Sequence, residues 1–224
     1  GMENSKNYIV GKNQKDSDFA IKIENVEFKY FNSEENTFTN LDVNIYKNKH
    51  TIITGPNGSG KSTLLGLISG VLYPTKGSIS VISDRFGYVG ANPMILNSSL
   101  RENLIYGNNK KISDEDLLKY LKLFKTFESD DRYDLDSKVS NKSLSSGQMQ
   151  KIAYIRTLVY GVEILILDES TANLDSESKK VIYKIIEDLD ITIINSTHNP
   201  DELLSYDYHI KTEDLITEKP GLNE

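Results

Sequence analysis

A glycine-rich segment of the chain has the pattern of a phosphate-binding loop. Positions 55–63 read GPNGSGKST, which fits G-x-x-x-x-G-K-S/T. Because glycine has no Cβ, backbone N–H groups in such a loop can turn inward around phosphate oxygens. The pattern predicts that Lys61 reaches the β- and γ-phosphates of a nucleotide and that the Ser62 hydroxyl binds Mg²⁺. The predicted nucleotide contacts come from Gly55, Asn57, Gly58, Ser59, Gly60, Lys61, Ser62 and Thr63.

The residues on either side of the loop predict how it is held. His50–Thr54 is typical of a short β-strand, and Leu64–Ser69 is typical of a helix. The helix would begin at the loop, so that the positive end of its dipole faces the phosphates. A glycine-rich turn in front of a helix, with no ligand, is the alternative that this segment alone leaves open.

Three more polar groups follow apolar runs that predict buried strands. Glu163–Leu167 is followed by Asp168 and Glu169, and Ile191–Ile194 leads to His198. Continuous apolar runs are typical of parallel strands that are covered on both faces. Because parallel strands end at one edge of their sheet, where ligands bind, we expect these groups to lie beside the phosphate loop.

The two adjacent carboxylates suggest different functions. Neighbouring side chains of an extended chain point in opposite directions. We therefore expect Asp168 to hold Mg²⁺, directly or through water, and Glu169 to face the attacking water. His198 is expected to contact the γ-phosphate. The alternatives are a surface acidic pair that caps the next helix and a histidine with no catalytic function.

A second candidate anion site precedes an apolar-rich helix. Residues 144–148 read LSSGQ, and Ser145 with Gln148 three positions later is a capping-box pattern. A helix N-terminus that carries serine and glycine is also an anion site, so both interpretations can hold together. The phosphate loop already serves the nucleotide of this chain. Ser145, Gly147 and Gln148 could therefore serve the nucleotide of a second molecule.

Length and composition exclude several classes of protein. The chain has 224 residues, of which 38% are hydrophobic and 26% charged, as in a globular protein with one large domain or a domain and a subdomain. Its net charge of −7 and the lack of a basic stripe argue against nucleic acid as a partner. No apolar run reaches the roughly 20 residues that span a bilayer, so we expect any membrane function to come from docking onto another protein. Cysteine is absent, which fits a reducing compartment.

The order of the elements predicts an α/β fold: a P-loop NTPase core with a mostly parallel sheet, a small antiparallel β subdomain and an inserted helical subdomain. Alternating polar and apolar residues predict strands over 20–28 and 41–45, and shorter strands are predicted over 78–81 and 86–89. Helices are predicted near 98–106, 113–124, 145–160 and 176–189. Residues 1–18 are interpreted as a linker or arm with little order of its own, because residues 2–18 are rich in Asn, Lys, Ser and Asp.

Together these motifs resemble the nucleotide-binding domain of an ATP-binding cassette (ABC) transporter over residues 20–210. Gly55–Thr63 resembles the Walker A loop, Ile164–Asp168 resembles Walker B, and Leu144–Gln148 is similar to the signature that is highly specific for this family. Thr171–Asp175 resembles the D-loop. The resemblance implies an ABC ATPase domain over residues 19–212, with a helical subdomain at about 92–160 and a C-terminal tail over 213–224.

The resemblance also implies a mechanism and its participants. It makes Lys61, Glu169 and His198 catalytic, with Glu169 as the catalytic glutamate and His198 as the switch histidine, and it makes Tyr30 an adenine-stacking aromatic. The cofactors would be ATP and Mg²⁺. Two such domains, identical in a homodimer, would clamp two ATP molecules head to tail, with the signature acting in trans. The cycle would drive a transmembrane domain or subunit from the cytoplasmic face of the membrane.

Two segments bear on the type of ABC transporter to which the chain could belong. Pro93–Leu96 followed by Ser99–Leu104 resembles the exporter-type segment that meets the transmembrane part, although the interval from Gly77 to Ala91 is shorter than in many exporters. The residues before Asp18 fit a linker from a preceding transmembrane part, so an excised domain and a separate subunit both stay open.

Two positions depart from the family pattern. Ala91 stands where the family usually has a glutamine, and a methyl group can neither bind Mg²⁺ nor polarise water. Asn92 is one residue away and would point elsewhere in an extended segment, unless a bulge lets it compensate. We therefore expect slower hydrolysis or altered coupling to the transmembrane part. Ser146 replaces the first glycine of the signature pair, and we expect binding to survive this small change.

Two other functions are alternatives to a transport ATPase. Soluble ABC ATPases of DNA repair or translation usually add a long coiled coil, for which the interval from Lys61 to Leu144 has no room, or a second cassette. A regulatory module that binds ATP but hardly hydrolyses it is the other alternative. Glu169 and His198 argue against such a module, and Ala91 argues weakly for it.

Overall fold

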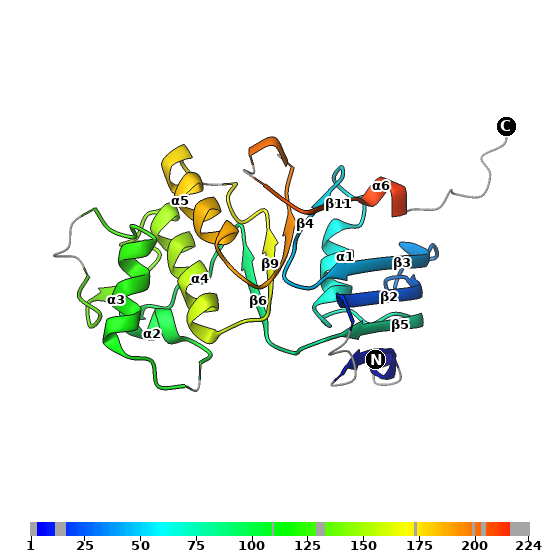
Figure 1. Ribbon diagram of the computed structural model, residues 1–224, viewed down its shortest axis with the longest axis horizontal. Helices are drawn as coiled ribbons and strands as arrows, with labels where there is room; N and C mark the ends of the chain where they lie inside the picture. Colours follow the sequence, from blue (N-terminus) through cyan, green and yellow to red (C-terminus); the bar gives the residue numbers. More distant parts are fainter. Residues whose placement is uncertain are drawn as a thin grey trace.

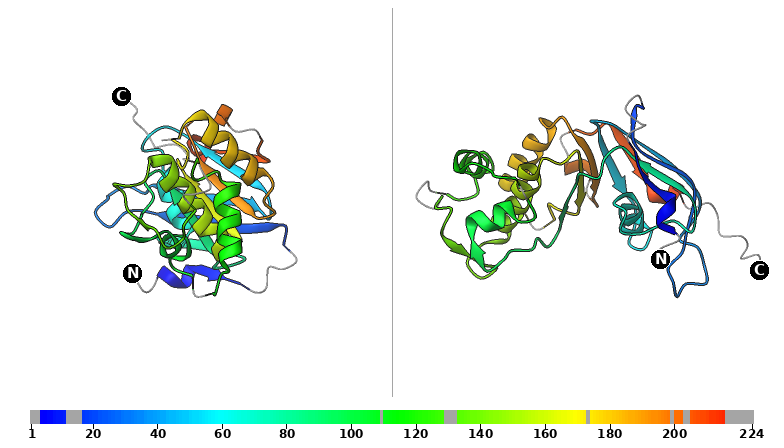
Figure 2. Two further views of the ribbon diagram at one scale, coloured as in Figure 1. Left: turned by 90° about the vertical axis from the view of Figure 1, so that its left-hand side faces the viewer. Right: turned by 90° about the horizontal axis from the view of Figure 1, so that it is seen from below.

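The computed structural model describes residues 4–11, 17–108, 110–128, 133–172, 174–198, 200–202 and 205–215. Within these ranges the chain forms two main β-sheets and a group of helices (Figure 1). The helices within residues 100–187 lie at one end of the molecule and the antiparallel sheet lies at the other, as Figure 2 shows. The predicted α/β fold with a mostly parallel sheet is confirmed.

The parallel sheet carries the strand ends that the sequence analysis singled out. Its strand order is β11-β4-β10-β9-β6, and every neighbouring pair is parallel. Four of these strands were predicted to within one or two residues. The fifth, β11, was not predicted, because YHIK has little hydrophobic pattern. The strands are β4 (His50–Thr54), β6 (Phe86–Gly90), β9 (Ile164–Asp168), β10 (Thr192–Ser196) and β11 (Tyr208–Lys211).

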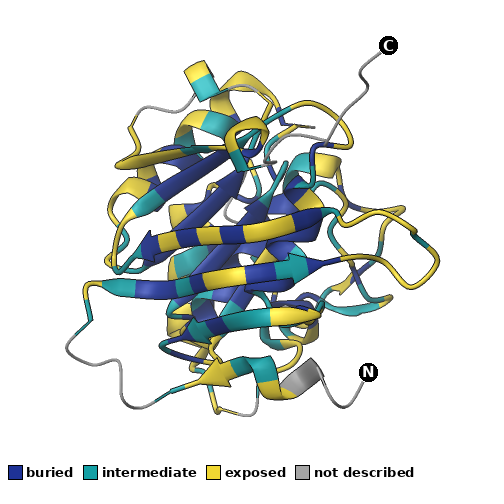
Figure 3. Cartoon of the chain, turned by 90° about the vertical axis from the view of Figure 1, so that its right-hand side faces the viewer, coloured by how far each residue is buried: buried dark blue, intermediate teal, exposed yellow. Residues whose placement is uncertain are grey.

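The second sheet contains the predicted antiparallel strands. β2 (Phe19–Phe28) pairs antiparallel with β3 (Phe38–Tyr46) on one side and with β5 (Lys76–Val81) on the other. Buried and exposed residues alternate along β3, as Figure 3 shows for the strands in front. One face of this sheet therefore packs on the core while the other meets solvent, which is the usual arrangement of an antiparallel sheet.

The start of the chain corrects one expectation. Residues 4–10 form a short 3₁₀ helix, η1 (Asn4–Asn7), and a strand, β1 (Tyr8–Val10), that pairs in parallel with β5. The Tyr8 hydroxyl donates a hydrogen bond to the Ile68 carbonyl oxygen (2.6 Å), and its ring lies edge-on to Tyr73. The expectation that this segment has little order is therefore wrong for residues 4–10, because Tyr8 anchors it.

Helix α1 (Lys61–Ile68) lies between the two sheets (Figure 1). Its buried side chains share one hydrophobic cluster with residues of both sheets, including Ile164 and Ile166 of β9. Leu165 and Leu167 of the same strand belong to a second cluster on the helical side. Because side chains alternate along a strand, β9 is buried on both faces and its last residue, Asp168, is held in place.

Four helices contribute to the second cluster. The helices predicted from the sequence are present, although Ser98 and Ser99 form the short strand β7 in front of the first one. β7 pairs with β8 (Lys138–Val139). The helices are α2 (Leu100–Ile105), α3 (Asp114–Leu123), α4 (Ser146–Tyr160) and α5 (Ser176–Glu187), and the chain further contains η4 (Pro200–Glu202) and α6 (Thr212–Leu215). Two of the four, α4 and α5, lie beside the parallel sheet, and the other two, α2 and α3, lie on the far side of α4 (Figure 1).

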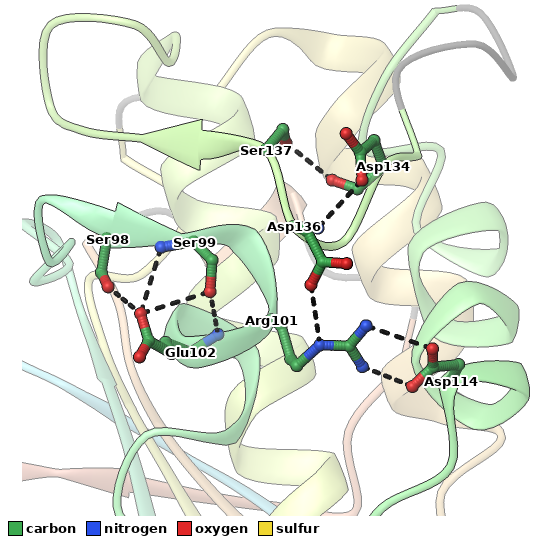
Figure 4. Close-up of polar contacts among 8 residues, drawn as sticks. All are labelled: Ser98, Ser99, Arg101, Glu102, Asp114, Asp134, Asp136 and Ser137. Carbon is green, nitrogen blue, oxygen red and sulfur yellow. Dashed lines mark hydrogen bonds and ion pairs between the residues drawn. The ribbon is translucent and has the colours of Figure 1, made fainter.

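Polar contacts fix the start of α2 against its neighbours (Figure 4). Ser99 is the N-cap, and its side chain and that of Glu102 form a capping box. Arg101 then joins two other segments: its guanidinium donates to the carboxylate of Asp114 at the start of α3 (Nη2–Oδ2 3.1 Å) and to that of Asp136 (Nε–Oδ1 3.2 Å). These bonds lower the pKa of Asp114. The Ser99–Leu104 segment is thus tied to the helical part of the fold.

The N-cap of α5 provides a stability test of the helix that follows β9. The Asp175 side chain accepts hydrogen bonds from the Ser178 backbone N–H and hydroxyl (both 2.8 Å). We predict that Asp175→Ala lowers the free energy of unfolding by about 1 kcal/mol, measured by urea denaturation, and that Asp175→Asn lowers it less. Equal stabilities of Asp175→Ala and the wild-type chain would contradict this assignment.

The same residue predicts a pH dependence. The Ser178 N–H lowers the pKa of Asp175 in the folded chain. Protons therefore bind the unfolded state more strongly, and the stabilisation by the charged cap is present above the unfolded pKa of about 3.9. It is lost as the pH falls through the lower folded pKa. The advantage of the wild-type chain over Asp175→Asn should disappear in that acidic range.

Candidate functional site

The phosphate loop connects β4 to α1 and leaves the N-terminus of the helix open. Gly60 is the N-cap of α1, with a left-handed conformation (φ 91°) and no side-chain cap. A Cβ at this position would lie 2.8 Å from Cζ of Phe38, so glycine is needed for both conformation and space. Gly58 is also left-handed (φ 80°), and it is exposed together with Asn57. An uncapped helix N-terminus behind a glycine loop fits the phosphates of a nucleotide.

Lys61 lies folded over this loop. Its side chain is 7% exposed, and Nζ donates to the carbonyl oxygens of Gly55 (2.7 Å) and Pro56 (3.1 Å). The ammonium group is thus held at the first residues of the loop. These carbonyl oxygens are neutral acceptors. A phosphate could take their place, because its charged oxygens would form stronger, charge-assisted hydrogen bonds with the ammonium group.

Two hydroxyls of the predicted nucleotide-binding set support the loop instead of facing outward. Ser59 is buried, and its Oγ lies 2.5 Å from Oγ1 of Thr212, which also donates to the Thr54 carbonyl oxygen (3.1 Å). Thr63 is buried as well, and its hydroxyl lies 2.8 Å from the Tyr30 hydroxyl. The side chains of Ser59 and Thr63 therefore hold the loop in place. Thr212 is a supporting residue that no sequence pattern indicated.

Tyr30 lies beside the first turn of α1. Its side chain is 47% exposed, and its ring is edge-on to Phe28, with ring centroids 5.0 Å apart. Its hydroxyl contact with Thr63 links it to the phosphate loop. The structure therefore places Tyr30 near the nucleotide-binding loop.

A cavity of about 400 Å³ lies between the phosphate loop and the end of β9. Ser62 lines it from the first turn of α1, and Asp168 and Glu169 line it from the end of β9. A serine hydroxyl and a carboxylate are the hard oxygen ligands that Mg²⁺ prefers, so these residues fit such an ion. The full lining is Ser62, Tyr88, Gly90, Ala91, Asn92, Asp168 and Glu169.

Glu169 contacts His198 across two neighbouring strands. The register of β9 and β10 pairs Asp168 with Ser196, and the Glu169 N–H donates to the Ser196 carbonyl oxygen (2.9 Å). His198 Nε2 then lies 2.6 Å from Glu169 Oε1, and both side chains are partly exposed. The structure thus brings together the two groups that the sequence placed at the ends of different strands.

The backbone at Glu169 corrects the argument made for the carboxylate pair. Glu169 has a φ of 51°, so the chain leaves the extended conformation there and the rule of alternating side chains does not apply. Both Asp168 and Glu169 consequently line the same cavity. A left-handed conformation is unusual for glutamate and is a form of strain that is often found at functional sites.

Two further residues of this cavity are Tyr88, which the sequence analysis missed, and Asn92, for which it left two alternatives open. The Tyr88 hydroxyl donates a hydrogen bond to Asp168 Oδ2 (3.0 Å), whereas the sequence indicated only an aromatic residue in a strand. Partial burial, followed by the charge of Asp168, raises the pKa of Tyr88 to about 12, so this hydroxyl keeps its proton at neutral pH. Asn92 lies in a bend with Ala91 and lines the cavity. Of the two alternatives that the sequence left open for Asn92, the structure therefore favours a departure from the extended conformation that brings Asn92 to the cavity.

The signature residues line a different and larger cavity, of about 820 Å³. Ser145, Gly147 and Gln148 are there at the N-terminus of α4. The predicted capping box is present: the Gln148 N–H donates to Ser145 Oγ (3.2 Å), and the Ser145 N–H donates to Gln148 Oε1 (2.9 Å). Lys151 also lines the cavity; burial lowers its pKa, and its amine donates to the Lys125 carbonyl oxygen (3.0 Å). The described linings of the two cavities share no residue.

None of the helices in the part of the chain that the structure describes combines the length and apolar composition needed to cross a membrane.

Comparisons with known proteins show the family to which the chain belongs. The family model described as "ABC transporter" matches residues 38–172. An ABC transporter ATP-binding protein of Clostridium acetobutylicum is 33% identical over 201 residues, which cover 81% of this chain and 71% of that protein. The zinc uptake system ATP-binding protein ZurA of Listeria monocytogenes is 31% identical over 214 residues, which cover 85% of this chain and 80% of that protein.

A solved structure shows the same fold. The chain is similar to a bacterial Atm1-family ABC exporter with ATP bound, with a TM-score of 0.77 and 23% identity over 87% of this chain and 37% of that chain. This likeness shows the fold, and the family model and the sequence relatives show the family. The chain belongs to the ABC transporter family, as a nucleotide-binding domain that is an ATPase.

Proposed function

We propose that the chain binds and hydrolyses Mg²⁺-ATP between two copies arranged head to tail, and that this cycle drives a transmembrane transport partner. One observation carries the proposal: Ser62 of the phosphate loop lines one cavity with Asp168 and Glu169, while the signature residues line another. A single chain thus holds two half-sites that do not meet. A second copy, turned by a two-fold axis, would complete each half-site with the other.

The first half-site would hold the nucleotide. Lys61 would exchange its two carbonyl contacts for the β- and γ-phosphates, and Ser62 and Asp168 would hold Mg²⁺, which neutralises phosphate charge during phosphoryl transfer. Tyr30 would stack on the adenine, since it lies half exposed beside the phosphate loop. Gly55, Asn57, Gly58 and Gly60 would supply the loop itself.

Glu169 would act as the general base. Its Oε1 is engaged by His198 at 2.6 Å, so Oε2 is the atom that would accept a proton from the attacking water. His198 would orient this carboxylate and contact the γ-phosphate. Both side chains are partly exposed in the single chain, and a second copy covering the cavity would exclude bulk water from them.

The second half-site would act in trans. Ser145 and Gly147 at the N-terminus of α4 would contact the γ-phosphate held by the other copy, with Gln148 beside them. A Cβ at Gly147 would find its nearest neighbours at 3.8 Å, in Leu174 and Ser178, so nothing inside the described chain requires glycine there. A ligand that approaches α4 from outside the chain would explain the glycine at position 147, because a side chain there would stand in its way.

We further propose that the transport is export and that the chain sits at the cytoplasmic face of the membrane. The support is the Ser99–Leu104 segment, which resembles the exporter type and forms α2, tied to its neighbours by Arg101. Met94, just before this segment, is 52% exposed, and its carbonyl oxygen accepts a hydrogen bond from Arg156. We propose that this surface meets the transmembrane partner. In this scheme the ATPase domain spans residues 19–212, with its helical part at about 92–160. Residues 1–18 lead from that partner onto the antiparallel sheet, where β1 pairs with β5, and the C-terminal tail over 213–224 begins within α6.

Replacing the proposed base tests the function directly. The wild-type chain should hydrolyse ATP with Mg²⁺, and Glu169→Gln should lower turnover by roughly 10²–10⁴-fold, the usual contribution of a general base. Because ATP then stays bound, Glu169→Gln with Mg²⁺-ATP should elute as a dimer in size-exclusion chromatography. The matched control is Glu24→Gln, which changes an exposed glutamate of β2 and should leave turnover unchanged. An exclusively monomeric Glu169→Gln chain in saturating Mg²⁺-ATP would contradict the proposal.

A single cysteine tests the docking surface. The chain has no cysteine, so Met94→Cys creates one unique thiol at an exposed position. When this variant is expressed in its native cells, where the transmembrane partner is present, a short thiol–amine reagent should crosslink it to a transmembrane protein. Val71→Cys is the control, since Val71 is 76% exposed but lies in the turn after α1. Crosslinks from Val71→Cys with none from Met94→Cys would show that another surface faces the partner.

A further inference from the structure

We propose that Tyr88 is a positioning residue for Asp168, in a cavity to which Ala91 contributes no metal-binding group. This inference rests on the proposed function, in which Asp168 holds Mg²⁺. The Tyr88 side chain connects β6 to that carboxylate, because its hydroxyl donates a hydrogen bond to Asp168 Oδ2 (3.0 Å).

The strand register explains how Tyr88 reaches Asp168. β6 and β9 pair Tyr88 with Ile166 and Gly90 with Asp168. Tyr88 is therefore two residues short of the carboxylate, and its ring must lie along the strand to reach it. Gly90 allows this, because a Cβ there would come within 3.0 Å of Tyr88 Cε1 and 3.1 Å of its hydroxyl oxygen. The glycine beside Asp168 thus makes room for the tyrosine.

The hydrogen bond restricts the metal-binding carboxylate. With Oδ2 accepting from Tyr88, Oδ1 is the oxygen left to face a cation, and the carboxylate cannot rotate freely. Groups that orient a ligand in this way typically change metal affinity by about 10–100-fold when they are removed. The Tyr88 bond is a single contact at a partly exposed site, so the lower end of this range is the reasonable expectation.

The residue at position 91 explains why the hydrogen bond between Tyr88 and Asp168 matters. Ala91 lines the same cavity as Ser62, Asp168 and Tyr88, and its methyl group offers no oxygen to a cation. The Tyr88 hydroxyl is a polar group that β6 itself contributes to this cavity, and Asn92 contributes another from the following bend. Tyr88 therefore compensates for Ala91 by orienting a ligand that is present, without becoming a ligand itself.

The test measures metal-dependent binding without turnover. In the Glu169→Gln background, a fluorescent ATP analogue is bound at increasing Mg²⁺ concentrations, with and without Tyr88→Phe. Tyr88→Phe should raise the Mg²⁺ concentration for half-maximal binding by roughly tenfold and leave metal-free nucleotide affinity unchanged. Tyr160→Phe is the matched control, because it removes a hydroxyl from another partly exposed tyrosine, at the end of α4, and should cause no shift.

Two more variants separate positioning from loss of fold. Gly90→Ala places a methyl group against the Tyr88 ring, so it should produce a similar shift in Mg²⁺ dependence, and the Gly90→Ala/Tyr88→Phe double variant should show no larger shift than either change alone. Ala91→Gln added to Tyr88→Phe should restore Mg²⁺ affinity, because it adds a side-chain oxygen to the lining of this cavity. Additive shifts in the first double variant, or no recovery in the second, would overturn the inference.

The outcomes also distinguish this inference from the proposed function. If the Glu169→Gln chain with native Tyr88 binds the analogue without any dependence on Mg²⁺, the proposed function fails. If that chain needs Mg²⁺ but Tyr88→Phe has the same requirement, the proposed function stands and the assignment of Tyr88 is wrong.

Discussion

The parallel hydrogen bonding of β4, β10 and β9 is the constraint on which the rest of the structure depends. It brings Thr54, Ser196 and Asp168 to one edge of the sheet, and the residues that follow each strand meet there. The position of α1 follows from the same sheet, because the helix is buried between it and the antiparallel strands. A shift of β9 by one residue would exchange its two buried faces and move Asp168 away from Ser62.

The same arrangement divides the chemistry between two places. Helix α4 begins on the helical side of the sheet, where Ser145 is held by its own capping box and lines a separate cavity with Asp175 and Ser178. Nothing in the described fold brings this N-terminus to Lys61. Under the proposed function, the two half-sites would join only when two chains meet, and hydrolysis would then depend on that association.

Much of this could be predicted from the sequence, because glycine patterns and buried strands have local signatures. The loop over 55–63, the capping box at Ser145 and the convergence of Asp168, Glu169 and His198 followed from spacing and strand order alone. The left-handed conformation of Glu169, the bend at Asn92 and the Ser59–Thr212 contact did not, because each depends on neighbours far away in the sequence. Tyr88 was missed for the same reason: its function comes from a cross-strand contact and from the space above Gly90. Asn173 of the predicted D-loop lies outside the described residues.

The central claim is that each ATP is hydrolysed by the phosphate loop of one copy and the signature of the other. Co-expression of Lys61→Ala chains with Ser145→Arg chains tests it most directly, because each variant alone lacks one half of every site. In a mixed head-to-tail dimer one site combines both defects and the other combines two intact halves. The account predicts that either variant alone is inactive and that the co-expressed pair recovers roughly a quarter of wild-type turnover, as expected for random pairing. Purified mixed dimers with no recovered turnover would contradict it.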